Sequence, residues 1–146
     1  MSYWDTSALV KLYVPEADSP MFERHAQNPT APRVSARIAA WEARATFRRK
    51  EAEGVIQAWA GERLYRELLH DASVGLWRFI EMGADVETEF ARALNVCFTQ
   101  SPPVLIRTLD AIHLASARVA NETEIVATDR RLREAAALLG FALFPK

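Results

Sequence analysis

Apolar residues recur along this chain with two spacings, one typical of helices and the other of short buried strands. A helix over 6–14 places its apolar side chains on one stripe and ends before Pro15. A short apolar run over 125–128, bounded by polar residues, predicts a strand instead. The two patterns alternate through the chain and no tight hairpin signal interrupts them. The sequence therefore predicts an α/β protein with a mostly parallel sheet between helices on both faces, folded as a single domain over 1–146.

The remaining elements follow from the same patterns and from their caps. Four further strands are expected at 2–4, 33–34, 76–80 and 141–144. In the first half of the chain, helices are expected from Asp18 or Ser19 to a break at Asn28-Pro29-Thr30, from a cap at Ser35 to about Ala52, and from Gly54 to about Leu69. In the second half, helices are expected from a cap at Asp85 to about Phe98 and from near Asp110 onward. The last helix is expected from about Arg130 to a left-handed residue at Gly140.

Two aspartates come directly after predicted strands. Asp5 follows the strand at 2–4, and Asp129 follows the strand at 125–128. Because the carboxyl ends of parallel strands meet at one edge of a sheet, both side chains should point into one crevice. Each could instead be a helix cap, although Thr6 and Ser7 could cap the first helix and free Asp5. Asp110, in the first turn of a helix, allows the same two interpretations.

A fourth acid, Glu42, lies on an apolar helix face with Ile38 and Ala45. A carboxylate is costly to bury unless it meets a cation or a metal, and an arginine partner is the alternative. Four acids converging without an obvious lysine or histidine would repel one another, and a divalent cation would relieve that repulsion. Carboxylate oxygens suit Mg²⁺ or Mn²⁺ rather than zinc. Such an ion activates water and stabilises charge in phosphodiester cleavage.

Other polar residues supply candidate supporting roles. His113, three residues after Asp110, is expected to orient that carboxylate and not to act as a general base. Hydroxyl groups beside the acids could orient the acids or a water molecule. These are Thr6, Ser7 and Thr128. Arginines near the predicted crevice could contact phosphate, or could simply be solvated. These are Arg48, Arg49, Arg130 and Arg131.

Composition narrows the class of protein. The chain has 146 residues, half of them hydrophobic, and a formal net charge of −1, so no global basic field indicates nucleic acid. A single cysteine, Cys97, excludes an internal disulfide and a cysteine-based zinc cluster, and its helical spacing predicts a core thiol. No apolar run is long enough for a membrane span and no signal peptide is evident. A cytoplasmic location is therefore expected.

Four segments, taken in order, resemble those of PIN domains, and within them the VapC-like toxins of bacterial toxin–antitoxin pairs. The segment at Asp5-Thr6-Ser7-Ala8-Leu9 looks like the opening motif, and 35–42 looks like the helix with the second acid. The segment at 109–115, LDAIHLA, is similar to the third motif, and Thr128-Asp129-Arg130-Arg131-Leu132 looks like the fourth. The Trp41-Glu42 segment departs from the expected flanks, which makes Glu42 the least typical of the four acids.

The resemblance implies a five-stranded parallel sheet and Mg²⁺- or Mn²⁺-dependent endoribonuclease chemistry at Asp5, Glu42, Asp110 and Asp129. It also implies a homodimer that a small cognate antitoxin protein neutralises. An RNA-processing nuclease outside a toxin system, or a non-catalytic binding module of the same fold, are the alternatives. The helix after Gly54 is apolar around much of its circumference and is a candidate surface for the antitoxin. Its apolar residues are Trp59, Leu64, Tyr65, Leu68 and Leu69.

Overall fold

Helices and strands alternate along the chain in a computed structural model that describes residues 1–27 and 31–146. The predicted break at Asn28-Pro29-Thr30 lies outside the described residues. The strands are β1 (Ser2–Trp4), β2 (Arg33–Ala36), β3 (Trp77–Ile80), β4 (Glu124–Val126) and β5 (Ala142–Phe144). The helices are α1 (Thr6–Val10), α2 (Ser19–Ala26), α3 (Arg37–Ala52), α4 (Ala60–Ser73), α5 (Ala84–Phe98), α6 (Thr108–Val119) and α7 (Arg130–Leu138).

The five strands form one sheet in the order β3-β2-β1-β4-β5, and every neighbouring pair is parallel. This confirms the predicted α/β architecture. The chain moves outward from β1 to β3 and then crosses to β4 on the other side of β1, so the strand order reverses between β1 and β4. At such a reversal the connections leave in opposite directions and open a crevice at the carboxyl ends of the strands.

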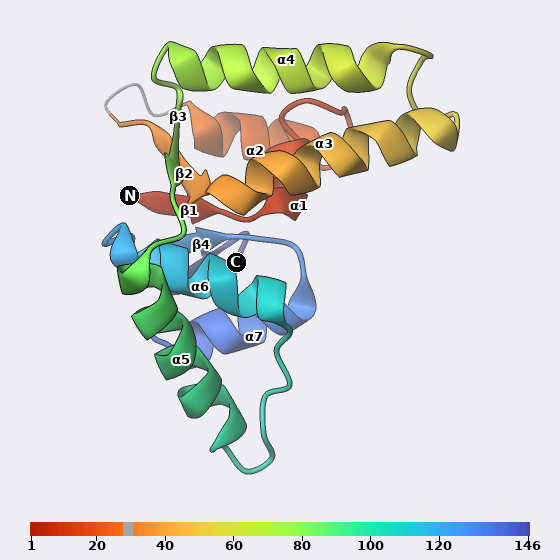
Figure 1. The fold of residues 1–146 in the computed structure, drawn as a ribbon. Coiled ribbons are helices and arrows are strands. Elements are labelled where there is room, and N and C mark those ends of the chain that lie inside the picture. The colour runs from red at the N-terminus through yellow and green to blue at the C-terminus, as the bar shows by residue number, and fades with distance from the viewer. Residues whose placement is uncertain (28–30) are drawn as a thin grey trace.

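Helices cover both faces of the sheet (Figure 1). On one face α1 to α4 pack over a core that includes Trp4, Phe47 and Leu68. On the other face α5, α6 and α7 enclose a second core that includes Tyr3, Leu114 and Leu132. Adjacent residues of β1 thus enter opposite cores, as the two-residue period of a strand requires. Among the described helices, none is long and apolar enough to cross a membrane.

The predicted cap at Ser35 is wrong. Ser35 lies within β2, where it pairs with Phe79 of β3, and its hydroxyl donates to the carbonyl oxygen of Trp4 at 2.6 Å. α3 begins two residues later, with Ala36 at the cap position and no side-chain cap. The Ser35 hydroxyl therefore joins β2 to β1. It donates to a carbonyl oxygen of β1 instead of accepting a hydrogen bond from a backbone amide at the start of α3.

Other predicted boundaries shift in the same way. α5 has Gly83 as its cap, with Asp85 in the first turn. α1 ends four residues earlier than expected, and α4 begins only at Ala60, after Trp59 in a left-handed conformation with φ of 69°. Gly140 has φ of 85° and follows Leu139, the residue that caps the end of α7, so its left-handed conformation is as predicted. Cys97 is fully buried in the core, also as predicted.

The two leucines of α7 at 132 and 138 provide a test of the second core. Leu132 is 1% exposed and Leu138 is 38% exposed. We expect Leu132→Ala to lower the free energy of unfolding by about 2–5 kcal/mol, because it leaves a cavity among packed side chains. Leu138→Ala, the matched control, should cost less than about 1 kcal/mol. Urea denaturation of both variants measures the difference, and equal losses would contradict this assignment of the core.

Candidate active site

The four predicted acids line one cavity of about 380 Å³ at the carboxyl ends of β1 and β4. β1 and β4 pair directly, and the amide of Asp5 donates to the carbonyl oxygen of Val126 at 3.0 Å. The cavity lies where the strand order reverses, as expected for an open parallel sheet. Its lining residues are Asp5, Thr6, Ser7, Glu42, Arg107, Thr108, Leu109, Asp110, His113, Asp129 and Leu132. We call it the acid cavity.

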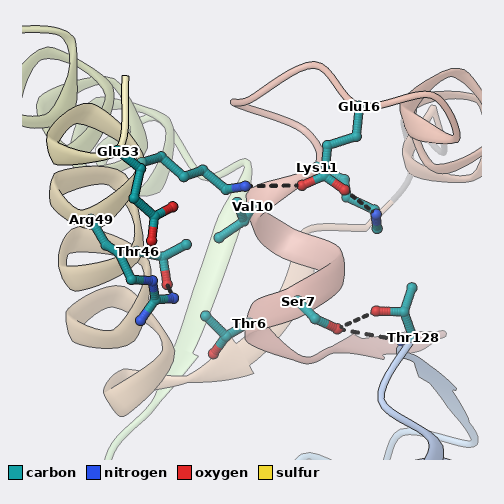
Figure 2. A pocket seen from close by; sticks show the side chains of 10 residues that line it. Thr6, Ser7, Val10, Lys11, Glu16, Thr46, Arg49, Glu53 and Thr128 are labelled. Atoms are coloured by element: carbon teal, nitrogen blue, oxygen red, sulfur yellow. Dashed lines mark hydrogen bonds and ion pairs between the residues drawn. The ribbon is translucent and has the colours of Figure 1, made fainter. Parts of the chain in front are cut away.

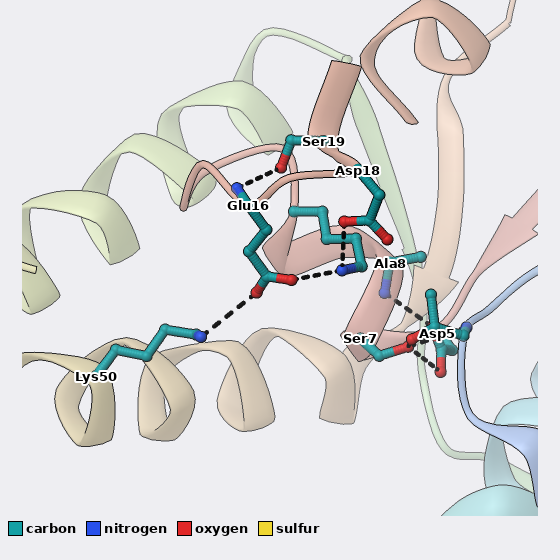
Figure 3. Close-up of polar contacts among 9 residues, drawn as sticks. Asp5, Ser7, Ala8, Glu16, Asp18, Ser19 and Lys50 are labelled. Atoms are coloured by element: carbon teal, nitrogen blue, oxygen red, sulfur yellow. Dashed lines mark hydrogen bonds and ion pairs between the residues drawn. The ribbon is translucent and has the colours of Figure 1, made fainter. Parts of the chain in front are cut away.

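Asp5 is the deepest of the four acids, with 5% of its surface exposed. Its carboxylate accepts hydrogen bonds from the amide of Ala8 at 2.9 Å and from the hydroxyl of Ser7 at 2.8 Å (Figure 3). The prediction that Thr6 or Ser7 caps α1 in its place is therefore wrong, since Asp5 is the cap. Burial raises the pKa of Asp5, and the charge of Asp129 adds to that effect, while His113 and the hydrogen bonds to Ala8 and Ser7 oppose it.

Asp110 and Asp129 each accept a backbone hydrogen bond at the start of a helix while they line the acid cavity. Asp129 caps α7 by accepting from the amide of Leu132 at 2.9 Å. Asp110 lies in the first turn of α6 and accepts from the amide of Arg107 at 2.9 Å. In each carboxylate one oxygen accepts this bond, and the other has no hydrogen-bond partner among residues 1–27 and 31–146. Each side chain thus stabilises a helix start with one oxygen and leaves the other open to a ligand.

The hydroxyl groups of the site connect its two strands. Ser7 donates to Asp5 and accepts from the hydroxyl of Thr128 at 2.9 Å (Figure 2). This links the chain after β1 to the chain after β4. Thr6 turns the other way and donates to Glu42 at 2.8 Å. The predicted supporting hydroxyls therefore all contact the acids directly or through one neighbour.

Glu42 is held by a chain of hydrogen bonds that begins in the sheet. The Tyr3 hydroxyl accepts from the amide of Ala36 at 3.0 Å and lies 2.7 Å from Nδ1 of His113. Burial raises the pKa of Tyr3, so its hydroxyl keeps its proton and donates it to Nδ1. Nε2 of His113 then carries the ring proton and donates to Glu42 at 2.9 Å. The expected partner of His113 was Asp110, and that prediction is wrong.

This chain of contacts sets the charge state of Glu42. Burial acts to raise the pKa of Glu42, but the hydrogen bonds that it accepts from His113 and Thr6 outweigh burial and lower the pKa. Glu42 therefore stays ionised while Asp5, deeper in the site, resists ionisation. Two carboxylates of one cavity are thus shifted in opposite directions by their surroundings.

The four candidate arginines fall into two groups. Arg48 faces away from the acid cavity and forms ion pairs with Glu51 and Glu62, at 3.9 and 3.6 Å. Arg49 lines a neighbouring cavity. Arg130 and Arg131 line another, together with Arg107, which the sequence did not single out. The signal that could have found Arg107 is its place three residues before Asp110.

The four acids of the acid cavity offer oxygen atoms, which are the type of donor that a hydrated divalent cation prefers. All four acids are oxygen donors, and at least two keep an oxygen without a protein partner. Among the residues that the structure describes, no three His, Cys, Asp or Glu side chains come close enough together to enclose a metal ion. By the type of donor alone, carboxylate oxygens suit Mg²⁺ or Mn²⁺ better than zinc.

Comparisons with known proteins agree with this fold. A family model described as the PIN domain matches residues 2–138, and the chain therefore belongs to the PIN domain family. A search of the curated proteins found no match.

Solved structures share the fold at low sequence identity. FitAcB from Neisseria gonorrhoeae has a TM-score of 0.69 and 16% identity, covering 99% of this chain and 96% of that chain. VapC20 from Mycobacterium tuberculosis, described as a sarcin-ricin loop cleaving toxin, has a TM-score of 0.65 and 17% identity, covering 92% and 95%. VapBC2 from Rickettsia felis, bound to a DNA fragment from its promoter, has a TM-score of 0.64 and 16% identity, covering 98% and 97%.

The contact between His113 and Glu42 predicts a measurable shift in titration. We expect His113→Ala to raise the pKa of Glu42, because the carboxylate loses the donor that stabilises its charge while it stays half-buried. His113→Gln, which keeps an N–H donor, should raise it less. Carbon-detected NMR titration of the Glu42 carboxyl group in metal-free protein measures both shifts.

The contact between His113 and Glu42 also predicts how the free energy of unfolding changes with pH. A carboxylate whose folded-state pKa is lowered contributes stability above its unfolded-state pKa, and this is lost as the pH falls through the folded-state value. The stability difference between wild type and His113→Ala should therefore be larger at neutral pH than in acid. An unchanged Glu42 titration in a folded His113→Ala variant would show that the contact does not hold this carboxylate.

Proposed function

We propose that this protein is a Mg²⁺-dependent endoribonuclease, with Mn²⁺ able to substitute, and that it is the toxin of a toxin–antitoxin pair. The observation that carries the proposal is the convergence of four carboxylates from four separate segments on one cavity. Membership of the PIN domain family supports it. The fold shared with VapC20, described as a sarcin-ricin loop cleaving toxin, is a further support.

In this mechanism Asp5, Asp110 and Asp129 would hold the cation directly or through water, with Glu42 beside them. A bound Mg²⁺ supplies a water of lowered pKa and neutralises charge that develops on the phosphate. Ser7 orients the Asp5 carboxylate through its hydroxyl. His113 and Thr6 keep Glu42 ionised and fixed in place, so that it would add a negative charge beside the cation. No covalent bond between RNA and protein is needed.

The acid cavity predicts the outcome of Asp5→Asn. Because the folded-state pKa of Asp5 is raised, its contribution to stability is present in acid and is lost as the pH rises through the folded-state value. Asparagine, an equally good helix cap, removes that penalty. We expect the metal-free melting temperature at neutral pH to rise and this gain to vanish in acid. Cleavage of total RNA should fall by about a hundredfold or more.

Two controls make the Asp5→Asn experiment decisive. Added Mg²⁺ should raise the melting temperature of the wild type more than that of the variant, since a ligand of the folded state stabilises it. Glu87→Gln, an exposed acid on α5, should change neither cleavage nor metal response. Full wild-type cleavage in EDTA, or full cleavage by Asp5→Asn, would contradict the proposed chemistry.

We propose a short antitoxin protein as the partner. The fold shared with a structure described as a toxin–antitoxin complex from Klebsiella pneumoniae, at a TM-score of 0.57 and 14% identity, supports this. The proposed surface is smaller than the apolar helix surface expected from the sequence. Leu64 and Leu68 are 6% and 0% exposed, so they belong to the core and are not available to a partner. Trp59, at the start of α4, is 88% exposed. The homodimer and the cytoplasmic location stay predictions.

Trp59 gives the test of the partner surface. We expect Trp59→Ala to weaken binding of the proposed antitoxin by about tenfold, or 1.4 kcal/mol, because an exposed indole is a large apolar anchor. Cleavage by the isolated nuclease should not change. Phe98→Ala, which removes an exposed aromatic from α5, is the matched control. Calorimetric affinities that are equal for wild type and Trp59→Ala would refute this surface, and the lack of any encoded partner would favour an RNA-processing role.

A further inference from the structure

Two solvent-exposed leucines lie beside the candidate catalytic acids, one in the acid cavity and one in a neighbouring cavity. The neighbouring cavity, of about 410 Å³, shares Arg107 and Asp129 with the acid cavity. Leu105 lines the neighbouring cavity and is 65% exposed. Leu109 lines the acid cavity and is 42% exposed. The chemistry proposed for the four acids uses neither side chain, so both apolar groups need another explanation.

The exposure of Leu105 follows from the residues on either side of it. The amide of Ile106 donates to the carbonyl oxygen of Val104 at 3.0 Å, so Leu105 forms the apex of a three-residue turn. The amide of Val104 donates to the carbonyl oxygen of Cys97 at 2.9 Å, and the Ile106 side chain is buried in the second core. Both ends of the turn are thus attached to the fold, and they hold Leu105 outward.

Leu109 is held in place by the start of α6. It is the second residue of that helix, and Asp110 after it accepts from the amide of Arg107 at 2.9 Å. Side chains of consecutive helical residues point about 100° apart, so Leu109 does not share the direction of Asp110. Leu109 nevertheless lines the acid cavity, together with the buried side chain of Leu132. The cavity that holds the four acids thus also has an apolar wall.

Charged groups separate these leucines from any larger apolar surface. All the other residues that line the cavity of Leu105 are charged, namely Arg107, Asp129, Arg130, Arg131 and Glu134. A protein partner that docks through apolar contacts needs a continuous patch, typically of roughly several hundred Å². A nucleic acid strand instead alternates charged phosphates with bases, and an unstacked base packs its flat face against apolar side chains. Single leucines among charged residues therefore suit a nucleotide better than a helix of another protein.

We infer that Leu105 and Leu109 are substrate-binding residues that pack against the two bases nearest the scissile phosphate. Leu109 contacts the base at the acid cavity, and Leu105 contacts the next base along the strand. Because a leucine side chain has no hydrogen-bonding atom, these contacts select for the size of a base and not for its polar edge. A purine should therefore bind more tightly than a pyrimidine at both positions. This inference rests on the proposed ribonuclease function and adds to it the residues that hold the bases.

Binding measured apart from cleavage tests these contacts. The probe is a fluorescein-labelled single-stranded RNA oligonucleotide, titrated with protein in EDTA and followed by fluorescence anisotropy. Leu105→Ala and Leu109→Ala should each weaken binding by about fivefold to tenfold, as the loss of roughly 40–55 Å² of buried apolar surface at about 25 cal/mol per Å² implies. Leu138→Ala is the matched control, since Leu138 is exposed on α7 and lines neither cavity, and it should leave binding unchanged. Circular dichroism confirms that each variant is folded.

Oligonucleotides that each lack one base separate a base contact from any other effect of the substitutions. Where the missing base is the one that Leu109 contacts, wild type and Leu109→Ala should bind equally well, because both have lost the same contact. At the adjacent position, wild type and Leu105→Ala should bind equally well. Losses that persist whichever base is missing would overturn the base contacts. Unchanged binding of both leucine variants to the intact oligonucleotide would also overturn them.

Cleavage of the same oligonucleotide with Mg²⁺ keeps this inference distinct from the proposed function. Wild-type protein whose binding depends on the two leucines but that never cleaves would contradict the ribonuclease function and leave the base contacts standing. Wild-type protein that cleaves while its binding is independent of both leucines would support the ribonuclease function and overturn the base contacts.

Discussion

The parallel pairing of β1 with β4 is the contact on which the rest of this structure depends. Both strands have only three residues, yet their register places Trp4 opposite Val126. The chain leaves β1 toward one face of the sheet through α1 and leaves β4 toward the other face through α7 (Figure 1). Asp5 and Asp129 follow these strands and therefore lie on either side of one crevice. A different strand order would separate them.

Bringing these acids together has an electrostatic cost, and the protein offsets part of it with helix amides. Asp5, Asp110 and Asp129 each accept a backbone N–H at the start of a helix. Helix starts favour negative charge, so these bonds stabilise the carboxylates as well as the helices. The structural and the functional interpretation of these residues are therefore not alternatives. One oxygen caps the helix, and the other oxygen of Asp110 and of Asp129 is open to the cavity.

Support for the site is divided between the two helical layers. His113 on α6, in one layer, donates a hydrogen bond to Glu42 on α3, in the other layer. The Tyr3 hydroxyl of β1 contacts the second ring nitrogen of His113 and so fixes the imidazole. On the α1 side, Lys11 and Lys50 are neutralised by carboxylates. At the starts of α6 and α7, Arg107, Arg130 and Arg131 line a cavity together with two carboxylates, those of Asp129 and Glu134.

The order of elements, the parallel sheet and the places of Asp5 and Asp129 could all be predicted from the sequence. The reason is that strand ends and helix starts are encoded by neighbouring residues, and the edge shared by parallel strands follows from geometry alone. Gly140 and Cys97 were predictable for the same reason. Ser35, His113 and Arg107 were not. Ser35 binds a carbonyl 31 residues away, and His113 contacts Glu42 across 71 residues and Tyr3 across 110. Only the packing of the two helical layers onto the sheet decides such partners, because no local sequence pattern specifies which distant donor or acceptor lies within hydrogen-bond distance.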